Sequence, residues 1–396
     1  MQLRIVFVEV FITVSSINAL NRPDFESSWL PIRSQVKDSS AIRVTHGLGE
    51  IPLIVDVQVK SIDDPNNGFL FPAVGGQPRD DDSKDKYGGV LYVYNDREVT
   101  VTVPCRSNNS PSGSALYLDD DEYYTGFSIQ TSHDVLIRVR AWKASSLPEP
   151  NFQKTDIFVE ARSANVDEVY IEETHGLNEY PKYILVRAKH LDSSSAGNVS
   201  DGLGASVVSY ADQAHKGNGY FIYGYNDNDV RIWIASDSNG YILDGADGYG
   251  LDESVLTAYI EIYAWSDFPK ANEFTTHLGP DILDEQFEIP IERLHPDDFV
   301  RAFVESMSGI NEGYRFLGSG ALAIASTITD PGCSYGGLVY GYGHEKIRFW
   351  RPTDNGGLIC IGQGFGDGNA SDKQANGIVV ITRWPTWNTI ICTSFE

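Results

Sequence analysis

The stretch Tyr87-Gly88-Gly89-Val90-Leu91-Tyr92-Val93-Tyr94-Asn95-Asp96 sets the fold of this chain, because it occurs three times in altered form. It returns at 219–227 as Gly-Tyr-Phe-Ile-Tyr-Gly-Tyr-Asn-Asp and at 334–344 as Ser-Tyr-Gly-Gly-Leu-Val-Tyr-Gly-Tyr-Gly-His. Aromatic and β-branched residues followed by Asn-Asp or Gly-His predict a strand that enters a hairpin turn. A period of roughly 115–130 residues is too long for a solenoid unit and is the size of a domain.

Two other phrases accompany this one. His46-Gly47-Leu48-Gly49-Glu50-Ile51-Pro52 returns as His175-Gly176-Leu177-Asn178-Glu179-Tyr180-Pro181, whereas the third copy has only Leu294-His295-Pro296. Each copy closes on an alternating strand that ends in a tryptophan, and these are Trp142, Trp265 and Trp384. We expect these tryptophans to lie in the core.

Alternating strands and frequent Gly, Asn, Asp and Ser predict an all-β chain. The expected architecture is three tandem antiparallel β-sandwich modules, jelly-roll-like, at 24–144, 155–268 and 285–388. Proline-bearing linkers at 144–150 and 267–284 favour a semi-extended string of modules.

Residues 1–19 have the layout of a secretory signal peptide, with Arg4, an apolar stretch and small residues at Ser15, Ser16 and Ala19. Glu9 interrupts the apolar stretch, and the alternative is a buried N-terminal strand. No later apolar run approaches the length needed to cross a bilayer. We therefore expect a secreted, extracellular protein.

The chain carries 55 acidic against 30 basic residues, a formal net charge of −25. This charge argues against nucleic acids and anionic membranes as partners and favours cations or basic partners. Runs of aspartate suit weak, diffuse calcium binding without matching the EF-hand spacing. The candidate residues are Asp80, Asp81, Asp82, Asp119, Asp120 and Asp121. The alternative is that these runs are only solvated loops.

Four cysteines and three glycosylation sequons fit an oxidising, extracellular setting. Cys333 and Cys360 flank the central strand pair of the third copy, so a bridge between them is expected. Cys105 and Cys392 then either pair between modules or stay free, because connectivity does not follow from sequence. The sequons are Asn108, Asn198 and Asn369, each in a polar stretch typical of a surface loop.

The recurring His46 and His175 have no recurring His or acidic partner that would complete a metal or catalytic site. We interpret them as structural residues that bond to the backbone while glycine turns the chain. The Tyr94-Asn95 and Tyr225-Asn226 pairs are either a turn with core tyrosines or a sugar-binding platform. No phosphate loop or dinucleotide fingerprint is present, and we expect no enzyme and no tightly bound cofactor.

Together, the His-Gly-Leu phrase, the Asp-rich segment, the Tyr-Gly-Gly-Val phrase and the closing Val-Arg-x-Trp strand resemble a repeat of secreted, multi-module proteins of marine invertebrates. Some proteins of that kind belong to the organic matrix of coral skeleton or mollusc shell. The resemblance implies a context and no site residues. The expected function is that of an acidic matrix protein in biomineralisation, with extracellular matrix or a mineral surface as partner. The alternative is a lectin-like protein whose partners are glycans.

Overall fold

The structure is a computed structural model of the chain. It describes residues 19–36, 39–75, 87–105, 113–118, 123–162, 170–192, 195–205, 219–236, 240–245, 249–251, 253–269, 271–279, 287–320, 333, 335–353, 356–362, 364–366 and 372–386. Within these residues the regular elements are β-strands, apart from the single 3-10 turns η2 (Ala144–Ser146) and η4 (Gly309–Asn311). The predicted all-β, antiparallel sandwich class is confirmed.

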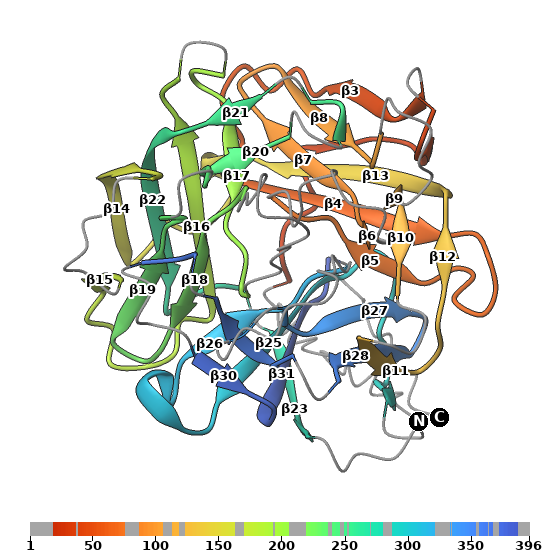
Figure 1. The fold of residues 1–396 in the computed structure, drawn as a ribbon. Helices are drawn as coiled ribbons and strands as arrows, with labels where there is room; N and C mark the ends of the chain where they lie inside the picture. Colours follow the sequence, from red (N-terminus) through yellow and green to blue (C-terminus); the bar gives the residue numbers. More distant parts are fainter. Residues whose placement is uncertain are drawn as a thin grey trace, which may run out of the picture.

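Three large sheets surround a common centre (Figure 1). Sheet 1 contains β1 (Phe25–Glu26), β2 (Leu30–Arg33), β4 (Ile54–Ser61), β5 (Leu70–Pro72), β11 (Tyr124–Gly126), β13 (Asp134–Trp142), β24 (Glu288–Pro290), β27 (Val339–Gly343) and β28 (Lys346–Pro352). Sheet 2 contains β3 (Ala41–Thr45), β7 (Leu91–Tyr94), β8 (Glu98–Thr102), β14 (Phe152–Glu160), β16 (Tyr183–His190), β17 (Val199–Asp201) and β22 (Thr257–Trp265).

Sheet 3 contains β15 (Ile171–Thr174), β18 (Ile222–Tyr225), β19 (Asp229–Trp233), β23 (Asn272–Leu278), β25 (Phe299–Ser306), β26 (Arg315–Leu317) and β31 (Gly377–Trp384). Four small pairs complete the described strands: β6 (Tyr87–Gly88) with β9 (Gly113–Ser114), β10 (Leu116–Tyr117) with β12 (Thr131–Ser132), β20 (Leu243–Asp244) with β21 (Ser254–Val255), and β29 (Ile359–Ile361) with β30 (Asp372–Gln374).

Each large sheet combines strands of two sequence repeats. The predicted hairpin of one repeat leaves its own long strands and pairs with the next repeat: β7–β8 enters sheet 2, β18–β19 enters sheet 3, and β27–β28 enters sheet 1. The three exchanges form a closed cycle, and the Leu20 amide donates to the Pro385 carbonyl at 3.0 Å where the cycle closes. We call the three junctions seam 1–2, seam 2–3 and seam 3–1, after the repeats that they join.

Because each sheet contains strands of two repeats, the repeats pack against each other and do not form the expected semi-extended string of modules. The first linker packs on the core, because the indole of Trp265 donates to the Pro148 carbonyl at 2.7 Å. The ranges 24–144, 155–268 and 285–388 remain a description of the sequence repeats. The reason for the difference is that the apolar pattern of a hairpin strand is the same whichever repeat supplies its neighbour.

The long strand pairs of the repeats share one register. Ile54 lies opposite Trp142, Tyr183 opposite Trp265, and Phe299 opposite Trp384. These residues meet in one buried cluster that draws on all three repeats. The three tryptophans are fully buried, as predicted. Phe299, for example, packs edge-on against Trp142 and in tilted contact with Trp384, at ring-centroid distances of 5.7 and 5.3 Å.

Three equivalent glycines allow the repeats to approach each other. A Cβ on Gly75 would lie 2.3 Å from the Asp201 carbonyl oxygen. A Cβ on Gly204 would lie 2.0 Å from the oxygen of Leu317, and one on Gly320 would lie 2.1 Å from the oxygen of Pro72. Each glycine therefore packs on the backbone of the next repeat, where no larger residue fits.

We expect Gly204→Ala to destabilise the protein by about 3 kcal/mol, because its methyl group would overlap backbone atoms that cannot move independently. The measurement is the free energy of unfolding in denaturant. Gly279→Ala is the matched control, because the atom nearest its new methyl group is the end of the Asn376 side chain. Equal stability of the two variants would contradict the account.

Candidate functional site

All residues predicted to bind calcium, and two of the three glycosylation sites, lie outside the described residues. They are Asp80, Asp81, Asp82, Asp119, Asp120, Asp121, Asn108 and Asn369. The disulfide candidate Cys392 also lies outside them. Among the residues that the structure describes, no group of three or more His, Cys, Asp or Glu side chains is placed to hold a metal ion. The calcium prediction therefore stays a prediction.

The predicted Cys333–Cys360 disulfide is present and closes a loop of 27 residues. Both cysteines are buried. Cys105 is half-buried and forms no disulfide within the described part of the chain.

Asn198 is the one sequon asparagine that the structure describes. It is half-buried just before β17, where its amide donates to Glu253 Oε1 at 2.6 Å and accepts from Asn95 Nδ2 at 3.0 Å. Ser200, the third residue of the sequon, is fully buried. Glycosylation at Asn198 remains a prediction, in a more enclosed place than the expected open loop.

The structural interpretation of the recurring histidines is confirmed. The Leu48 amide donates to His46 Nδ1 at 3.1 Å, and His46 Nε2 lies 3.0 Å from the Asn95 carbonyl oxygen. His175 repeats the arrangement with Leu177 and Asn226 at 3.2 Å each. The following glycines, Gly47 and Gly176, both have φ of 64°. Each histidine thus connects the turn at its following glycine to the neighbouring hairpin turn through hydrogen bonds.

The hairpin tyrosines belong to the core. Tyr94 and Tyr225 are buried, and Tyr94 donates its hydroxyl hydrogen to Asp201 at 2.9 Å. The side-chain oxygens of Asn95 and Asn226 accept hydrogen bonds from the backbone within their own turns. The core-and-turn interpretation of this phrase is confirmed, and neither tyrosine face is available to stack on a sugar.

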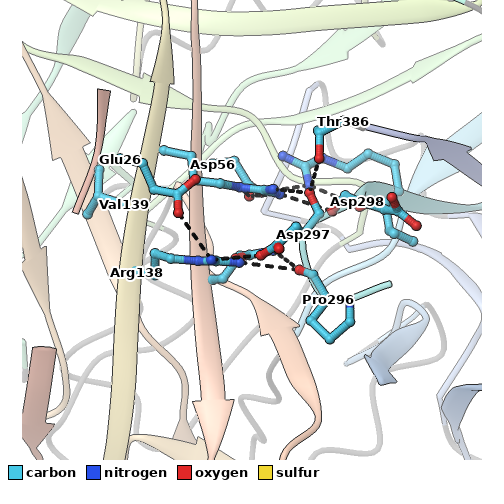
Figure 2. Close-up of polar contacts among 12 residues, drawn as sticks. Glu26, Asp56, Arg138, Val139, Pro296, Asp297, Asp298 and Thr386 are labelled. Atoms are coloured by element: carbon cyan, nitrogen blue, oxygen red, sulfur yellow. Dashed lines mark hydrogen bonds and ion pairs between the residues drawn. The ribbon is translucent and has the colours of Figure 1, made fainter. Parts of the chain in front are cut away.

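A cluster of charged side chains lies at seam 3–1 (Figure 2). At its centre, Asp56 on β4 accepts from Arg140 Nη2 on β13 at 2.7 Å and from Arg301 Nη1 on β25 at 2.9 Å. Arg140 also donates to the carbonyl oxygens of Asp297 at 2.6 Å and Asp298 at 3.1 Å. A buried carboxylate thus joins guanidinium groups of two repeats.

Arg138 extends this cluster toward the surface. It donates to Gln58 Oε1 at 2.7 Å and to Glu26 at 3.2 Å, and it pairs with the Asp297 carboxylate at 2.8 Å. Figure 2 shows its guanidinium group between Glu26 and the Pro296–Asp297 segment. Asp56, Arg138 and Arg140 of the first repeat each bond a group of the third repeat, so the cluster binds the two repeats together.

Arg140 and Arg301 favour the ionised form of the Asp56 carboxyl group. Burial raises the pKa of a carboxyl group, but Arg140 and Arg301 outweigh that effect and hold the pKa of Asp56 below its ordinary value. The equivalent positions on the other two long strands hold Leu185 and Arg301, as the shared register shows. Asp56 and Arg301 are therefore oppositely charged residues at equivalent positions of two repeats.

Related contacts hold the other two seams. At seam 1–2, Arg187 bonds Glu261 at 2.8 Å and donates to the Pro52 and Leu53 carbonyls at 2.8 and 3.1 Å. At seam 2–3, the Arg315 guanidinium lies 3.9 Å from the Tyr180 ring centre and bonds Glu305 at 3.0 Å. Sequence patterns alone did not identify these residues. Their only signal was a charged residue inside an otherwise apolar strand.

Comparison with known proteins gives no relative: no family model, curated protein or solved structure matches the chain. No helix in the described residues is long and apolar enough to cross a membrane.

We expect Asp56→Asn to lower the stability by about 3–5 kcal/mol at neutral pH, because two buried guanidinium groups lose their counter-charge. A carboxyl group whose pKa is lowered by folding stabilises the protein above its unfolded-state pKa, and this stabilisation is lost as the pH falls through the folded-state value. The variant should therefore be less stable at pH 7 and less sensitive to acid below about pH 4.

Denaturant unfolding between pH 2 and 7 measures both effects. Asp96→Asn, at a carboxylate with a side chain 61 % exposed, is the control and should behave like the parent protein. An Asp56→Asn variant as stable as the control at pH 7 would show that the seam does not depend on this charge.

Proposed function

We propose that the protein is a secreted, non-enzymatic, acidic component of an extracellular or skeletal organic matrix, which attracts calcium or a mineral face weakly and at many points. The observation that carries the proposal is the burial of the positive charges. Eight arginines have side chains no more than 13 % exposed and pair with carboxylates: Arg138, Arg140, Arg187, Arg231, Arg301, Arg315, Arg348 and Arg383.

Since these buried arginines are neutralised by carboxylates, the net charge of −25 is carried by the outer parts of the molecule. Because eight of the 30 basic residues pair with carboxylates inside the molecule, the acidic excess is carried by the remaining side chains. A surface rich in carboxylates attracts divalent cations over distances comparable to the Debye length, about 8–10 Å at physiological salt. Such attraction is weak for each ion and adds up over many ions, as a matrix protein on a mineral face requires.

The disulfide supports the extracellular part of the proposal. Cys333–Cys360 is a buried bridge, and such bridges form and persist mainly in oxidising compartments. The resemblance of the repeated phrases to secreted proteins of marine invertebrates fits the same setting. The lectin-like alternative lacks a comparable supporting observation, because the hairpin tyrosines that would stack on a sugar are buried.

Calorimetric titration of the full chain with calcium at low salt tests the proposal. We expect uptake of several ions with dissociation constants in the millimolar range, falling steeply as sodium chloride is added. Changing Asp80, Asp81 and Asp82 to Asn, or Asp119, Asp120 and Asp121 to Asn, should each remove part of the uptake. Absence of uptake at millimolar calcium would overturn the ionic part of the proposal.

A further inference from the structure

A cavity of about 50 Å³ lies at the centre of the molecule, where the three repeats meet. Gly75 of the first repeat and Gly204 of the second line it, together with residues 317–319 of the third. One water molecule takes roughly 10–15 Å³ of such a volume, so the cavity has room for about four. A cavity of this size accommodates water or a small ligand.

One tyrosine of each exchanged hairpin lines this cavity. Strand register makes Tyr92, Tyr223 and Tyr340 equivalent, and all three are buried. The Tyr92 hydroxyl donates to Asp201 at 2.6 Å, and the Tyr340 hydroxyl donates to the Val300 carbonyl at 3.2 Å. The Tyr223 hydroxyl has no hydrogen-bond partner among the residues that the structure describes.

Tyr183 supplies a second hydroxyl of this kind. It lies on β16 opposite Trp265, where the other repeats have Ile54 and Phe299, and it also lines the cavity. Within the described part of the chain its hydroxyl forms no hydrogen bond, although Tyr183 is only 5 % exposed and Tyr223 only 4 %. A buried hydroxyl without a partner costs about 1–3 kcal/mol. Two such groups at one cavity indicate a partner inside it.

Two side chains of opposite charge complete the polar wall. Asp201 and Arg301 are the only charged groups among the described residues that line the cavity, and no ion pair joins them. Burial raises the pKa of Asp201, and this rise is opposed by hydrogen bonds from Tyr92 and Tyr94 and by the charges of Arg187 and Arg301. The cavity thus separates a carboxylate from a guanidinium group.

Arg301 has hydrogen-bond donors beyond those that its protein partners use. Its bonds to Asp56 and to the Val300 carbonyl both start from Nη1, at 2.9 and 3.1 Å. Its Nε and Nη2 also carry N–H groups. The Tyr340 hydroxyl is a further neighbour and can accept one of them. Donors on Nε or Nη2 therefore remain for a group in the cavity.

The two charges select the class of molecule that fits. An anion alone would lie near the Asp201 carboxylate, and a cation alone would lie near the Arg301 guanidinium. An apolar molecule would leave the hydroxyls of Tyr183 and Tyr223 unpaired. A zwitterion avoids all three problems, because its carboxylate and its ammonium group can each bond the oppositely charged side chain. The small volume restricts the choice to the smallest amino acids.

We propose that the central cavity binds a small zwitterionic amino acid, of the size of glycine. Its carboxylate would bond Arg301 and its ammonium group Asp201, and the hydroxyls of Tyr183 and Tyr223 would bond its polar ends. Because Asp201 and Arg301 belong to different repeats, the bound molecule would also stabilise the closed cycle. The proposal uses no calcium and no surface carboxylate, so it is independent of the proposed matrix function.

Equilibrium dialysis of the full chain with radiolabelled glycine at neutral pH tests the site. We expect saturable binding of one molecule per chain and a thermal unfolding midpoint that rises with glycine concentration. Leucine, which has the same charged groups and a larger side chain, is the control for size. Acetate and methylamine are the controls for the separate charges. Absence of saturable glycine binding, as for a cavity that holds only water, would overturn the proposal, and so would equal binding of leucine or of methylamine.

Tyr223→Phe tests the unpartnered hydroxyl. Since this hydroxyl has no protein partner, the ligand-free variant should be as stable as the parent, while glycine binding should weaken about threefold to tenfold. Tyr314→Phe is the matched control, because the Tyr314 hydroxyl bonds Glu172 away from the cavity, and it should bind glycine like the parent. Unchanged glycine affinity in Tyr223→Phe would contradict the proposal.

Asp201→Asn tests the charge that the ammonium group requires. We expect glycine to bind about tenfold or more weakly, because a hydrogen bond to a charged group is lost. A folded Asp201→Asn protein with the parent's affinity for glycine would count against the site. Should this variant not fold, the Tyr223→Phe measurement decides alone.

Discussion

The close approach of three backbones at Gly75, Gly204 and Gly320 is the constraint on which the rest of the structure depends. At each of these glycines a Cβ would lie within 2.3 Å of a carbonyl oxygen of the next repeat. Only with this spacing can each hairpin reach the β5, β17 or β26 strand of its neighbour and extend a sheet across the seam. The three repeats consequently share both their sheets and their buried cluster of closing tryptophans.

Once the repeats are packed this closely, their equivalent residues face each other and cannot all be alike. Asp56 and Arg301 occupy equivalent positions and form an ion pair at 2.9 Å, while Leu185 takes the third position. The seams have diverged in the same way: at two of them an arginine bonds an asparagine of the neighbouring repeat, whereas strand register places Thr100 at the equivalent position of the third. The seams therefore differ in their side chains, whereas the repeated strands have the same arrangement in each repeat.

Much of the fold was predictable, because strands, turns and buried tryptophans follow from local alternation and turn residues. The Tyr94-Asn95 turn, the role of His46 and the Cys333–Cys360 bridge all depend on short-range patterns. The exchange of hairpins was not predictable, because Tyr94 alternates identically whether it pairs with its own repeat or with Val199 of the next. For the same reason the partners of Asp56 and Glu253 could not be read from their neighbours in sequence. Their contacts join segments separated by 245 and 55 residues.

The central claim is that the repeats complete each other and that none has a full sheet of its own. The most direct measurement is to produce residues 24–144 alone and record an amide NMR spectrum together with the molecular mass in solution. The account predicts either an unfolded chain or an assembly in which copies replace the missing neighbours. A folded monomer with dispersed amide signals and native-like stability would contradict it.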